Sequence, residues 1–375
     1  MNFGFSEEQE LLRAELRKFL DQHAPLEAVR KQVLLPDGFD RALYAQMSEL
    51  GWVGLAVAEE YGGAGLGTVD LVVVLEETGR SLFPSPFVAS QLAIAAIQRF
   101  GSAEQCARWL PGLASGERLG ALALLESSDR MGPAGIELVA QRSGGSLVLS
   151  GEKHFALDAA AADLCVVAFR EGPRDDDLRL ALLERSDPGV SARRTQCIDA
   201  TERPGVLALD RARVAPERVL AKAAGAAALA WLQDAGAVAV TAESLGAADA
   251  ALALTVGHAK QRVQFGEPIG RFQGVKHPLA EMYLDIESCR SLLYYAAWAL
   301  DEGEAAAPLA VSRAKAYASE FVPKLGIDVI QLHGAIGYTA EYDAQLYLKR
   351  AKWMRPAFGD AAWHYERVAG LLGGA

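Results

Sequence analysis

The spacing of apolar residues changes twice along this chain of 375 residues, and each change marks a different kind of secondary structure. Up to about residue 118, apolar side chains recur at the spacing of one helix face. From about Leu119 to Leu220 the pattern is short β-type runs such as SLVLSG, DLCVVAF and LRLALLE. From Ala224 to about residue 370, alanine- and leucine-rich stretches return to helical spacing. The sequence therefore predicts a helical, a β and a second helical part, in that order.

Local signals support this division. Ser6 and Gln9 form a capping-box pattern at the start of the first helix, and Gly144-Gly145 is a turn signal between two β runs. We predict an α+β fold that is mainly α, with an antiparallel β domain between two helical domains. The predicted domains are an N-terminal helical domain at 1–118, a middle β domain at 119–222 and a C-terminal four-helix bundle at 223–375. Helical patterns in the first domain include residues 40–50, 68–80 and 87–114.

Charge and composition exclude several classes of function. The net charge of -11 and the pI of about 5.2 repel phosphate backbones, so a nucleic-acid partner is not expected. The amino terminus has no export signal, which predicts a cytoplasmic protein. The most apolar segment contains Asp234, Glu243 and Asp249, so it is predicted to be a core helix rather than a membrane span. The four cysteines lie far apart without a CxxC pair, and we expect buried thiols and no metal site.

The most informative motif is RVQFGEPIGRFQ at residues 262–273, after the first long C-terminal helix. It resembles the RxxFGxxIGxFQ signature of the acyl-CoA dehydrogenase family. In that family the arginine contacts the flavin pyrophosphate and the phenylalanine lies near the adenine. The resemblance implies that Arg262, Phe265 and Gln273 bind FAD, and a guanidinium beside an aromatic ring suits a phosphate beside a purine. Taken singly, these residues also fit a helix end with a basic cap and a glycine stop.

A second motif, QLHGAIG at residues 331–337, resembles the family's QxxGGxG. The resemblance implies that Gln331, Gly334 and Ala335 approach the ADP part of the flavin across a subunit interface. Ala335 stands where the family has its second glycine, which adds a methyl group at a point of close approach. Similarity at FSEEQ, at residues 51–65 and at residues 210–220 extends the resemblance over nearly the whole chain.

Membership of this family would imply a specific chemistry. The acyl-CoA dehydrogenase fold holds FAD between the β domain and the C-terminal helices, with the acyl-CoA substrate against the flavin. A glutamate removes the α-proton of the thioester while the β-hydride passes to the flavin, which yields a 2-enoyl-CoA. An electron-transfer flavoprotein then accepts the electrons.

The chain departs from the family where the catalytic base is expected. Counting from the family motifs places Phe358 at one of the two family base positions and Gly236 at the other, and neither side chain can accept a proton. The catalytic residue is therefore unknown. Four carboxylates lie nearest in sequence to these positions, and each could be a displaced base or an ordinary structural residue. They are Asp234, Glu243, Glu341 and Asp360.

The segments expected around the flavin ring also depart from the family. The family's TEPGAGSD loop appears as LESSDRMGP at residues 125–133, without the flavin-contacting threonine. The WIT or WIS element, whose hydroxyl bonds the flavin, corresponds to Phe155-Ala156-Leu157, and leucine offers no hydrogen bond. The ring-binding half of the site is thus degraded while the adenine-binding half is intact.

This asymmetry resembles the degenerate subunit of the heterotetrameric acyl-CoA dehydrogenases of steroid side-chain breakdown. There, a homologous partner carries the base and the degenerate subunit completes its FAD site. Two alternatives remain open at this point. One is a homotetrameric acyl-CoA dehydrogenase with a relocated carboxylate, and the other is a flavoprotein of the same fold with different chemistry, such as a monooxygenase, or a non-catalytic binding subunit.

Overall fold

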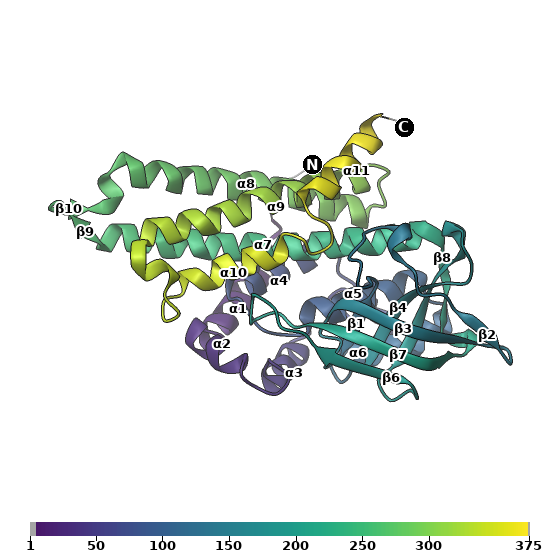
Figure 1. Ribbon diagram of the computed structural model, residues 1–375. Coiled ribbons are helices and arrows are strands. Elements are labelled where there is room, and N and C mark those ends of the chain that lie inside the picture. The colour runs from purple at the N-terminus through teal and green to yellow at the C-terminus, as the bar shows by residue number, and fades with distance from the viewer. Residues whose placement is uncertain (1–4, 374–375) are drawn as a thin grey trace. The chain divides into compact units, whose positions relative to one another are not determined.

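The computed structural model describes residues 5–373, and Figure 1 shows helices toward both ends of the chain with strands between them. The predicted order of helical, β and helical parts is confirmed. Sequence spacing did not predict α2, because seven residues are too few to show a repeated apolar face. The helices of the first part are α1 (Glu7–His23), α2 (Leu26–Gln32), α3 (Arg41–Glu49), α4 (Thr68–Arg80), α5 (Phe87–Phe100) and α6 (Ala103–Ala114).

Side-chain caps set where several of these helices begin. Ser6 Oγ accepts a hydrogen bond from Gln9 N at 3.2 Å, while Gln9 Oε1 accepts one from Ser6 N at 3.1 Å. This confirms the predicted capping box at α1. Ser102 and Gln105 form a second capping box at α6. Each cap contributes about 1 kcal/mol to the stability of its helix.

The β part consists of two four-stranded sheets, with strand orders β1-β4-β5-β8 and β2-β3-β7-β6. Leu149 and Leu207 of one sheet share a buried cluster with Val167 and Phe169 of the other, so the sheets pack face to face. The ladders are antiparallel as predicted, except that β1 pairs with β4 in parallel. The strands are β1 (Gly120–Ala123), β2 (Gln141–Ser143), β3 (Ser146–Leu157), β4 (Leu164–Arg170), β5 (Leu178–Glu184), β6 (Val190–Arg194), β7 (Pro204–Val214) and β8 (Val219–Ala224).

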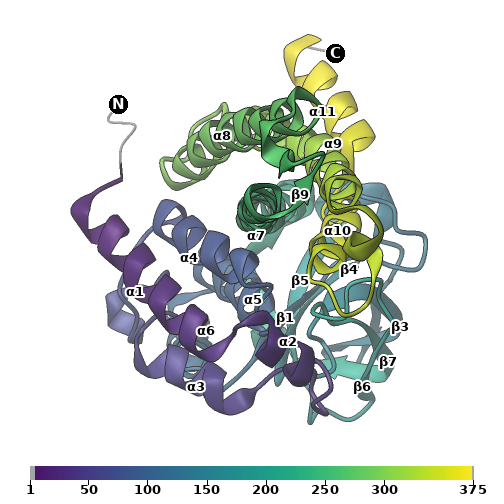
Figure 2. The same ribbon diagram turned by 90° about the vertical axis from the view of Figure 1, so that its left-hand side faces the viewer.

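Long helices make up the C-terminal part, and Figure 2 looks along α7 with α8, α9 and α10 around it. The helix α9 contacts α8, α10 and α11. By length and composition α7 could cross a membrane, but 78% of its most apolar window is buried inside the structure, as in a core helix. The helices are α7 (Gly225–Gln261), α8 (Gln273–Asp301), α9 (Ala307–His333), α10 (Ala344–Met354) and α11 (Ala361–Gly373).

The chain separates into two compact units. The helical unit comprises Met1–Lys31, Thr68–Phe83 and Ala237–Ala375. The mixed unit comprises Gln32–Gly67 and Pro84–Gly236 and contains both four-stranded sheets. The division into three domains at 1–118, 119–222 and 223–375 stays a prediction.

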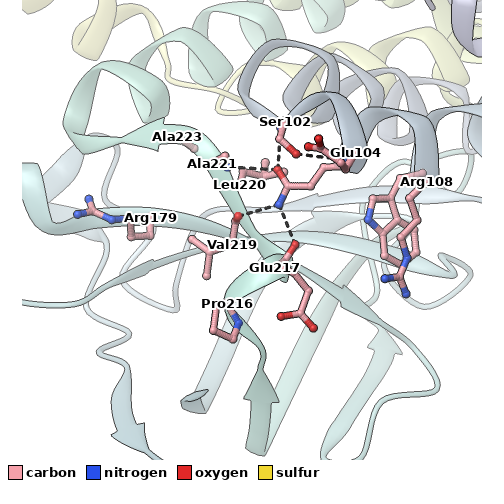
Figure 3. A pocket seen from close by; sticks show the side chains of 12 residues that line it. Ser102, Glu104, Arg108, Arg179, Pro216, Glu217, Val219, Leu220, Ala221 and Ala223 are labelled. Carbon is pink, nitrogen blue, oxygen red and sulfur yellow. Dashed lines mark hydrogen bonds between the residues drawn. The ribbon is translucent and has the colours of Figure 1, made fainter. Parts of the chain in front are cut away.

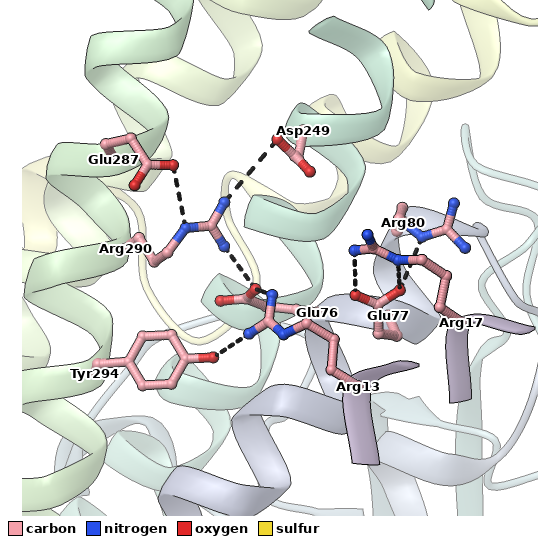
Figure 4. A network of polar contacts seen from close by, with 9 residues as sticks. All are labelled: Arg13, Arg17, Glu76, Glu77, Arg80, Asp249, Glu287, Arg290 and Tyr294. Atoms are coloured by element: carbon pink, nitrogen blue, oxygen red, sulfur yellow. Dashed lines mark hydrogen bonds and ion pairs between the residues drawn. The ribbon is translucent and has the colours of Figure 1, made fainter. Parts of the chain in front are cut away.

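Buried charges connect α1 and α8 to α4 in the helical unit (Figure 4). Glu76 Oε2 lies 3.1 Å from Arg13 Nη1 of α1 and 2.6 Å from Arg290 Nη1 of α8. The next residue, Glu77, lies 2.6 Å from Arg17 Nη2 of α1. Both glutamate side chains are at most 3% exposed, so each carboxylate depends on its arginine partners for compensation. Removing one partner from such a buried pair costs about 3–5 kcal/mol.

The helices α4 and α7 approach each other closely at two glycines. A Cβ added to Gly79 of α4 would lie 2.1 Å from the carbonyl oxygen of Glu243 in α7. A Cβ added to Gly246 of α7 would lie 1.8 Å from the carbonyl oxygen of Glu76 in α4. Because both obstructing atoms are backbone atoms, a side chain at either position would force the helices apart.

We expect Gly246→Ala to lower the free energy of unfolding by about 1–3 kcal/mol or more, because the added methyl group overpacks the contact between α4 and α7. Gly257→Ala is the matched control in the same helix, where an added Cβ meets nothing within 4 Å. That substitution should raise the free energy of unfolding by about 0.5–1 kcal/mol, the usual gain of alanine over glycine in a helix. Chemical denaturation measures both, and equal effects would contradict the close approach.

Candidate functional site

Arg262 and Phe265 lie in a short hairpin that follows α7. Its strands are β9 (Val263–Gln264) and β10 (Glu267–Pro268), joined by Phe265 at φ 55° and Gly266 at φ 80°. Positive φ at both central residues is the requirement of a type I′ turn, which explains the glycine. A bulky residue with positive φ is uncommon, and the Phe265 side chain is 94% exposed. The hairpin therefore exposes most of this ring, which also meets the ring of Phe272 at a centroid distance of 6.1 Å.

The guanidinium of Arg262 is available to an anion. The Arg262 backbone N–H donates to His258 O at 2.8 Å, and its carbonyl accepts from Ile269 N at 2.8 Å, so the backbone is fixed. The side chain is exposed, and within residues 5–373 no carboxylate lies in ion-pair distance of it. The nearby Arg271 differs, because its Nη1 lies 2.9 Å from Glu267 Oε1. Gln273, the third residue predicted from this motif, is exposed at the first position of α8.

The second motif lies at the end of α9. Gln331 is exposed in the last turn, and Gly334, at φ 66°, ends the helix and begins the 3-10 turn Gly334–Tyr338. Ala335 is exposed in that turn without a positive φ, so its methyl group is accommodated. The rings of His258 and His333, with centroids 4.4 Å apart, bring this segment to the Arg262 segment. The structure thus brings the two predicted motifs to one end of the helical unit.

Phe358, at the first base position, is half-buried and has φ 55°, followed by Gly359 at φ 96°. Gly236, at the second, is buried within α7. Neither position carries an ionisable group, as the sequence indicated.

A buried lysine holds the segment that contains Phe358. Lys315 of α9 is 2% exposed, and its Nζ donates to Gly359 O at 2.8 Å, Arg355 O at 3.0 Å and Ser319 Oγ at 2.7 Å. Burial lowers the pKa of Lys315 to about 7. Sequence reasoning missed this residue, because a lysine on an apolar helix has no local signal of the carbonyl groups it meets.

Two of the four carboxylates considered as displaced bases, Glu243 and Asp360, have structural partners. Glu243 is buried, accepts from Thr78 Oγ1 at 3.2 Å and lies 3.6 Å from Arg350 Nη1. Asp360 Oδ1 accepts from Trp363 N at 2.9 Å, so Asp360 is a helix cap for α11. Asp234 is buried in α7, and Glu341 is exposed in the loop before α10. These observations favour ordinary structural roles for Glu243 and Asp360.

In the mixed unit, the loop at residues 125–133 is anchored inward. Glu126 Oε1 accepts from Lys153 Nζ at 2.7 Å and from the backbone N–H groups of Glu137 and Leu138 at 2.9 Å each. The Lys153 side chain is fully buried, and burial lowers its pKa to about 8. Oε1 of this carboxylate is therefore fully engaged by its own chain.

The segment Phe155–Leu157 at the end of β3 offers no side-chain hydrogen bond. Phe155 has φ 57° and is 50% exposed, whereas Leu157 is 8% exposed. Asp158, at φ 53°, forms a buried ion pair with Arg203 that fixes the end of the strand. The residues present thus fit the nucleotide half of FAD, through a free guanidinium, an exposed ring and an exposed amide. They do not supply the hydroxyl contacts of the flavin half.

A cavity of about 680 Å³ lies elsewhere in the mixed unit, between α6 and β8 (Figure 3). The Gln105 side chain lines it, donating to Glu217 O at 2.9 Å and Val219 O at 2.8 Å. Its oxygen accepts from Ser102 N at 2.8 Å and Ala221 N at 3.2 Å. Because this amide is fully used by the backbone, it caps the edge of β8, and the cavity contains none of the predicted site residues.

Within residues 5–373, no three His, Cys, Asp or Glu side chains are grouped as metal ligands would be. Cys106, Cys165 and Cys289 are buried as expected, but Cys197 is only half-buried. The expectation of four buried thiols was wrong at this position, which follows β6 in a loop rather than a core strand.

Comparisons with known proteins indicate the same family along nearly the whole chain. Models of the acyl-CoA dehydrogenase N-terminal, middle and C-terminal domains match residues 6–117, 121–202 and 224–372. The chain is 32% identical over 346 residues to the acyl-CoA dehydrogenase IpdE2 of Mycobacterium tuberculosis, covering 92% of this chain and 91% of the relative. It is 30% identical over 360 residues to an acyl-CoA dehydrogenase of Bacillus subtilis, covering 92% and 93%. A chain of the ChsE4-ChsE5 complex from Mycobacterium tuberculosis superposes with a TM-score of 0.91 at 28% identity, covering 100% of both chains.

We expect the buried Lys315 to make stability depend on pH. Its pKa of about 7 lies below the 10.5 of an exposed lysine, so between these values the unfolded chain binds the extra proton. The free energy of unfolding should therefore rise with pH across this window. Lys315→Met should remove this rise and, by leaving carbonyl groups without a donor, lower stability by about 1–3 kcal/mol.

Lys324→Met in the same helix is the control, because the Lys324 side chain is 64% exposed and its Nζ lies 2.8 Å from Asp328 Oδ2 on the surface. Urea denaturation of the three proteins between pH 6.5 and pH 10 measures the difference. A rise of equal size in the Lys315→Met protein would show that another group is responsible.

Proposed function

Since this chain belongs to the acyl-CoA dehydrogenase family of oxidoreductases, we propose that it serves in the α,β-dehydrogenation of an acyl-CoA thioester to a 2-enoyl-CoA. We propose that it does so as one subunit of a hetero-oligomer, in which it completes the FAD site of a homologous partner. Bound FAD would supply the acceptor for the hydride, and an electron-transfer flavoprotein would reoxidise it. We also propose that the protein acts in the cytoplasm.

The observation that carries the proposal is the contrast between the two halves of the cofactor site. Arg262 is exposed without an acidic partner in the described chain, and Phe265 projects from the hairpin. In this reading Arg262 binds the pyrophosphate, Phe265 packs on the adenine, and Gln331 donates to the ADP part. Phe358 and Gly236, in contrast, cannot remove a proton. A chain that retains only the nucleotide contacts is suited to serve a site whose base comes from elsewhere.

The surface at this end of the helical unit is suited to a protein partner. Large apolar side chains gather on the segments that hold Arg262 and Gln331, and their exposed fractions range from 39% to 94%. Exposed apolar side chains gathered in this way are typical of interaction surfaces. The similarity to a chain of the ChsE4-ChsE5 complex supports a complex of two different chains. The exposed apolar residues of this surface are Val263, Phe265, Phe272, Ile336 and Tyr338.

The main alternative is a homotetramer with a relocated carboxylate. The partners of Glu243 and the capping role of Asp360 argue against these two residues as the base. Glu341 is exposed in the loop before α10, whereas a catalytic base must lie in a water-excluded position beside the substrate α-carbon. A monooxygenase-like chemistry would differ in the rapid reaction of reduced flavin with oxygen, which stopped-flow absorbance measures.

We expect Arg262→Gln to weaken FAD binding by the complex of this chain with its partner about 10- to 100-fold, the usual contribution of hydrogen bonds to a charged group. Arg271→Gln is the matched control, because Arg271 is an exposed arginine of the same segment that is paired with Glu267. Fluorescence titration of the apo complex with FAD measures both constants. Equal loss in the two variants would indicate a general charge effect and contradict the assignment of Arg262.

Co-expression with the product of an adjacent homologous gene tests the source of the base. We expect a stable complex whose flavin is bleached by acyl-CoA, with Asp360→Asn and Glu341→Gln in this chain changing the rate less than twofold. Asparagine keeps the cap of α11, so the first substitution should preserve the fold. If this chain alone binds one FAD per subunit and oxidises acyl-CoA, or if either substitution abolishes bleaching, the hetero-oligomer proposal fails.

A further inference from the structure

Two histidine rings form a contact between the segments that carry the two nucleotide motifs. The centroids of the His258 and His333 rings are 4.4 Å apart, and their planes are inclined by 34°. His258 lies one helical turn before Arg262, whose N–H donates to the His258 carbonyl at 2.8 Å. His333 is the last residue of α9, directly before Gly334. The position of one ring therefore constrains the position of both motifs.

His333 is held as a neutral ring with a defined tautomer. It is 6% exposed, and its Nδ1 lies 2.8 Å from the Val329 carbonyl oxygen. A carbonyl can only accept, so Nδ1 carries the proton and Nε2 has a lone pair. Nε2 is buried and has no hydrogen-bond partner within the described residues. A proton added to Nε2 would create a buried donor without an acceptor, which is unfavourable by about 1–3 kcal/mol.

The charges around the pair also oppose protonation. Burial lowers the pKa of His258, and the neighbouring His333 and Arg262 lower it further. Burial likewise lowers the pKa of His333, although its bond to the Val329 carbonyl acts in the other direction. The His333 ring also contacts the ring of Tyr342, with centroids 5.1 Å apart. The next residue, Asp343, is 2.9 Å from Arg30, so its charge is partly compensated.

We propose that His258 and His333 are positioning residues of the nucleotide site, whose neutral rings hold the Arg262 segment against the Gln331–Ala335 segment and separate when protonated. This inference rests on the proposed role of these segments in FAD binding. Acidification from pH 8 to pH 5.5 would then loosen both segments together and weaken FAD binding at the same time. Lys315 of α9 also gains a proton in this range, so the part of the change that belongs to the two rings is the part that disappears when both rings are replaced.

The test uses His258→Phe/His333→Phe, which keeps two aromatic rings in contact and removes both titrations. Amide hydrogen exchange of the full chain alone, corrected for the intrinsic effect of pH, reports residues 258–266 and 331–338. In the natural chain we expect protection in both segments to fall about tenfold between pH 8 and pH 5.5. The double variant should keep its protection. His277→Phe, an exposed position in α8, is the control and should behave as the natural chain does.

FAD binding by the complex at the two pH values separates this inference from the proposed function. If FAD binds and weakens equally with acid in the natural chain and the double variant, or if exchange shows the same pH dependence in both, the positioning role is wrong. If the exchange results are as expected but no FAD binds at either pH, the histidine contact stands and the proposed cofactor role fails.

Discussion

The helical unit depends on the close contact of α4 with α7. Gly79 and Gly246 allow the two backbones to meet, and this contact places Glu76 and Glu77 of α4 among arginines of α1 and α8. Such buried carboxylates are stable only when every partner is present. The glycines and the ion pairs therefore act together, because a larger residue at either glycine would displace the helix that carries the carboxylates.

Under the proposed function, this chain serves only the nucleotide half of a flavin site. The hairpin after α7 and the turn after α9 present polar and aromatic groups outward, with Arg262 and Phe265 exposed. In the other segments, Glu126 directs its carboxylate inward to Lys153, and Leu157 has no polar side-chain group. Positive φ recurs at Phe155, Phe265 and Phe358, each in a segment that the sequence resemblance predicts to lie at the cofactor or the base. Such strain persists where the surrounding structure determines it, and is typical of functional segments.

Local sequence predicted much of the fold, for physical reasons that particular elements illustrate. The strand β5 is the run LRLALLE itself, because a short apolar run bounded by polar residues is typical of a strand buried in a core, and Leu180–Leu183 are all buried. The capping box at Ser6 was predicted correctly because its hydrogen bonds join residues three positions apart. The parallel pairing of β1 with β4 was not predicted, since it joins strands more than forty residues apart by backbone bonds that carry no side-chain pattern.

By itself, the sequence determined the order of helical and β parts, the family resemblance of residues 262–273 and 331–337, and the presence of side chains that accept no proton at Phe358 and Gly236. These properties depend on residue type and short-range spacing. Only the tertiary structure decided that Lys315 holds the Phe358 segment and that His258 meets His333. A buried lysine or histidine looks the same in sequence whether or not a partner faces it. That partner comes from another element of the fold, so long-range packing alone assigns these side chains their roles.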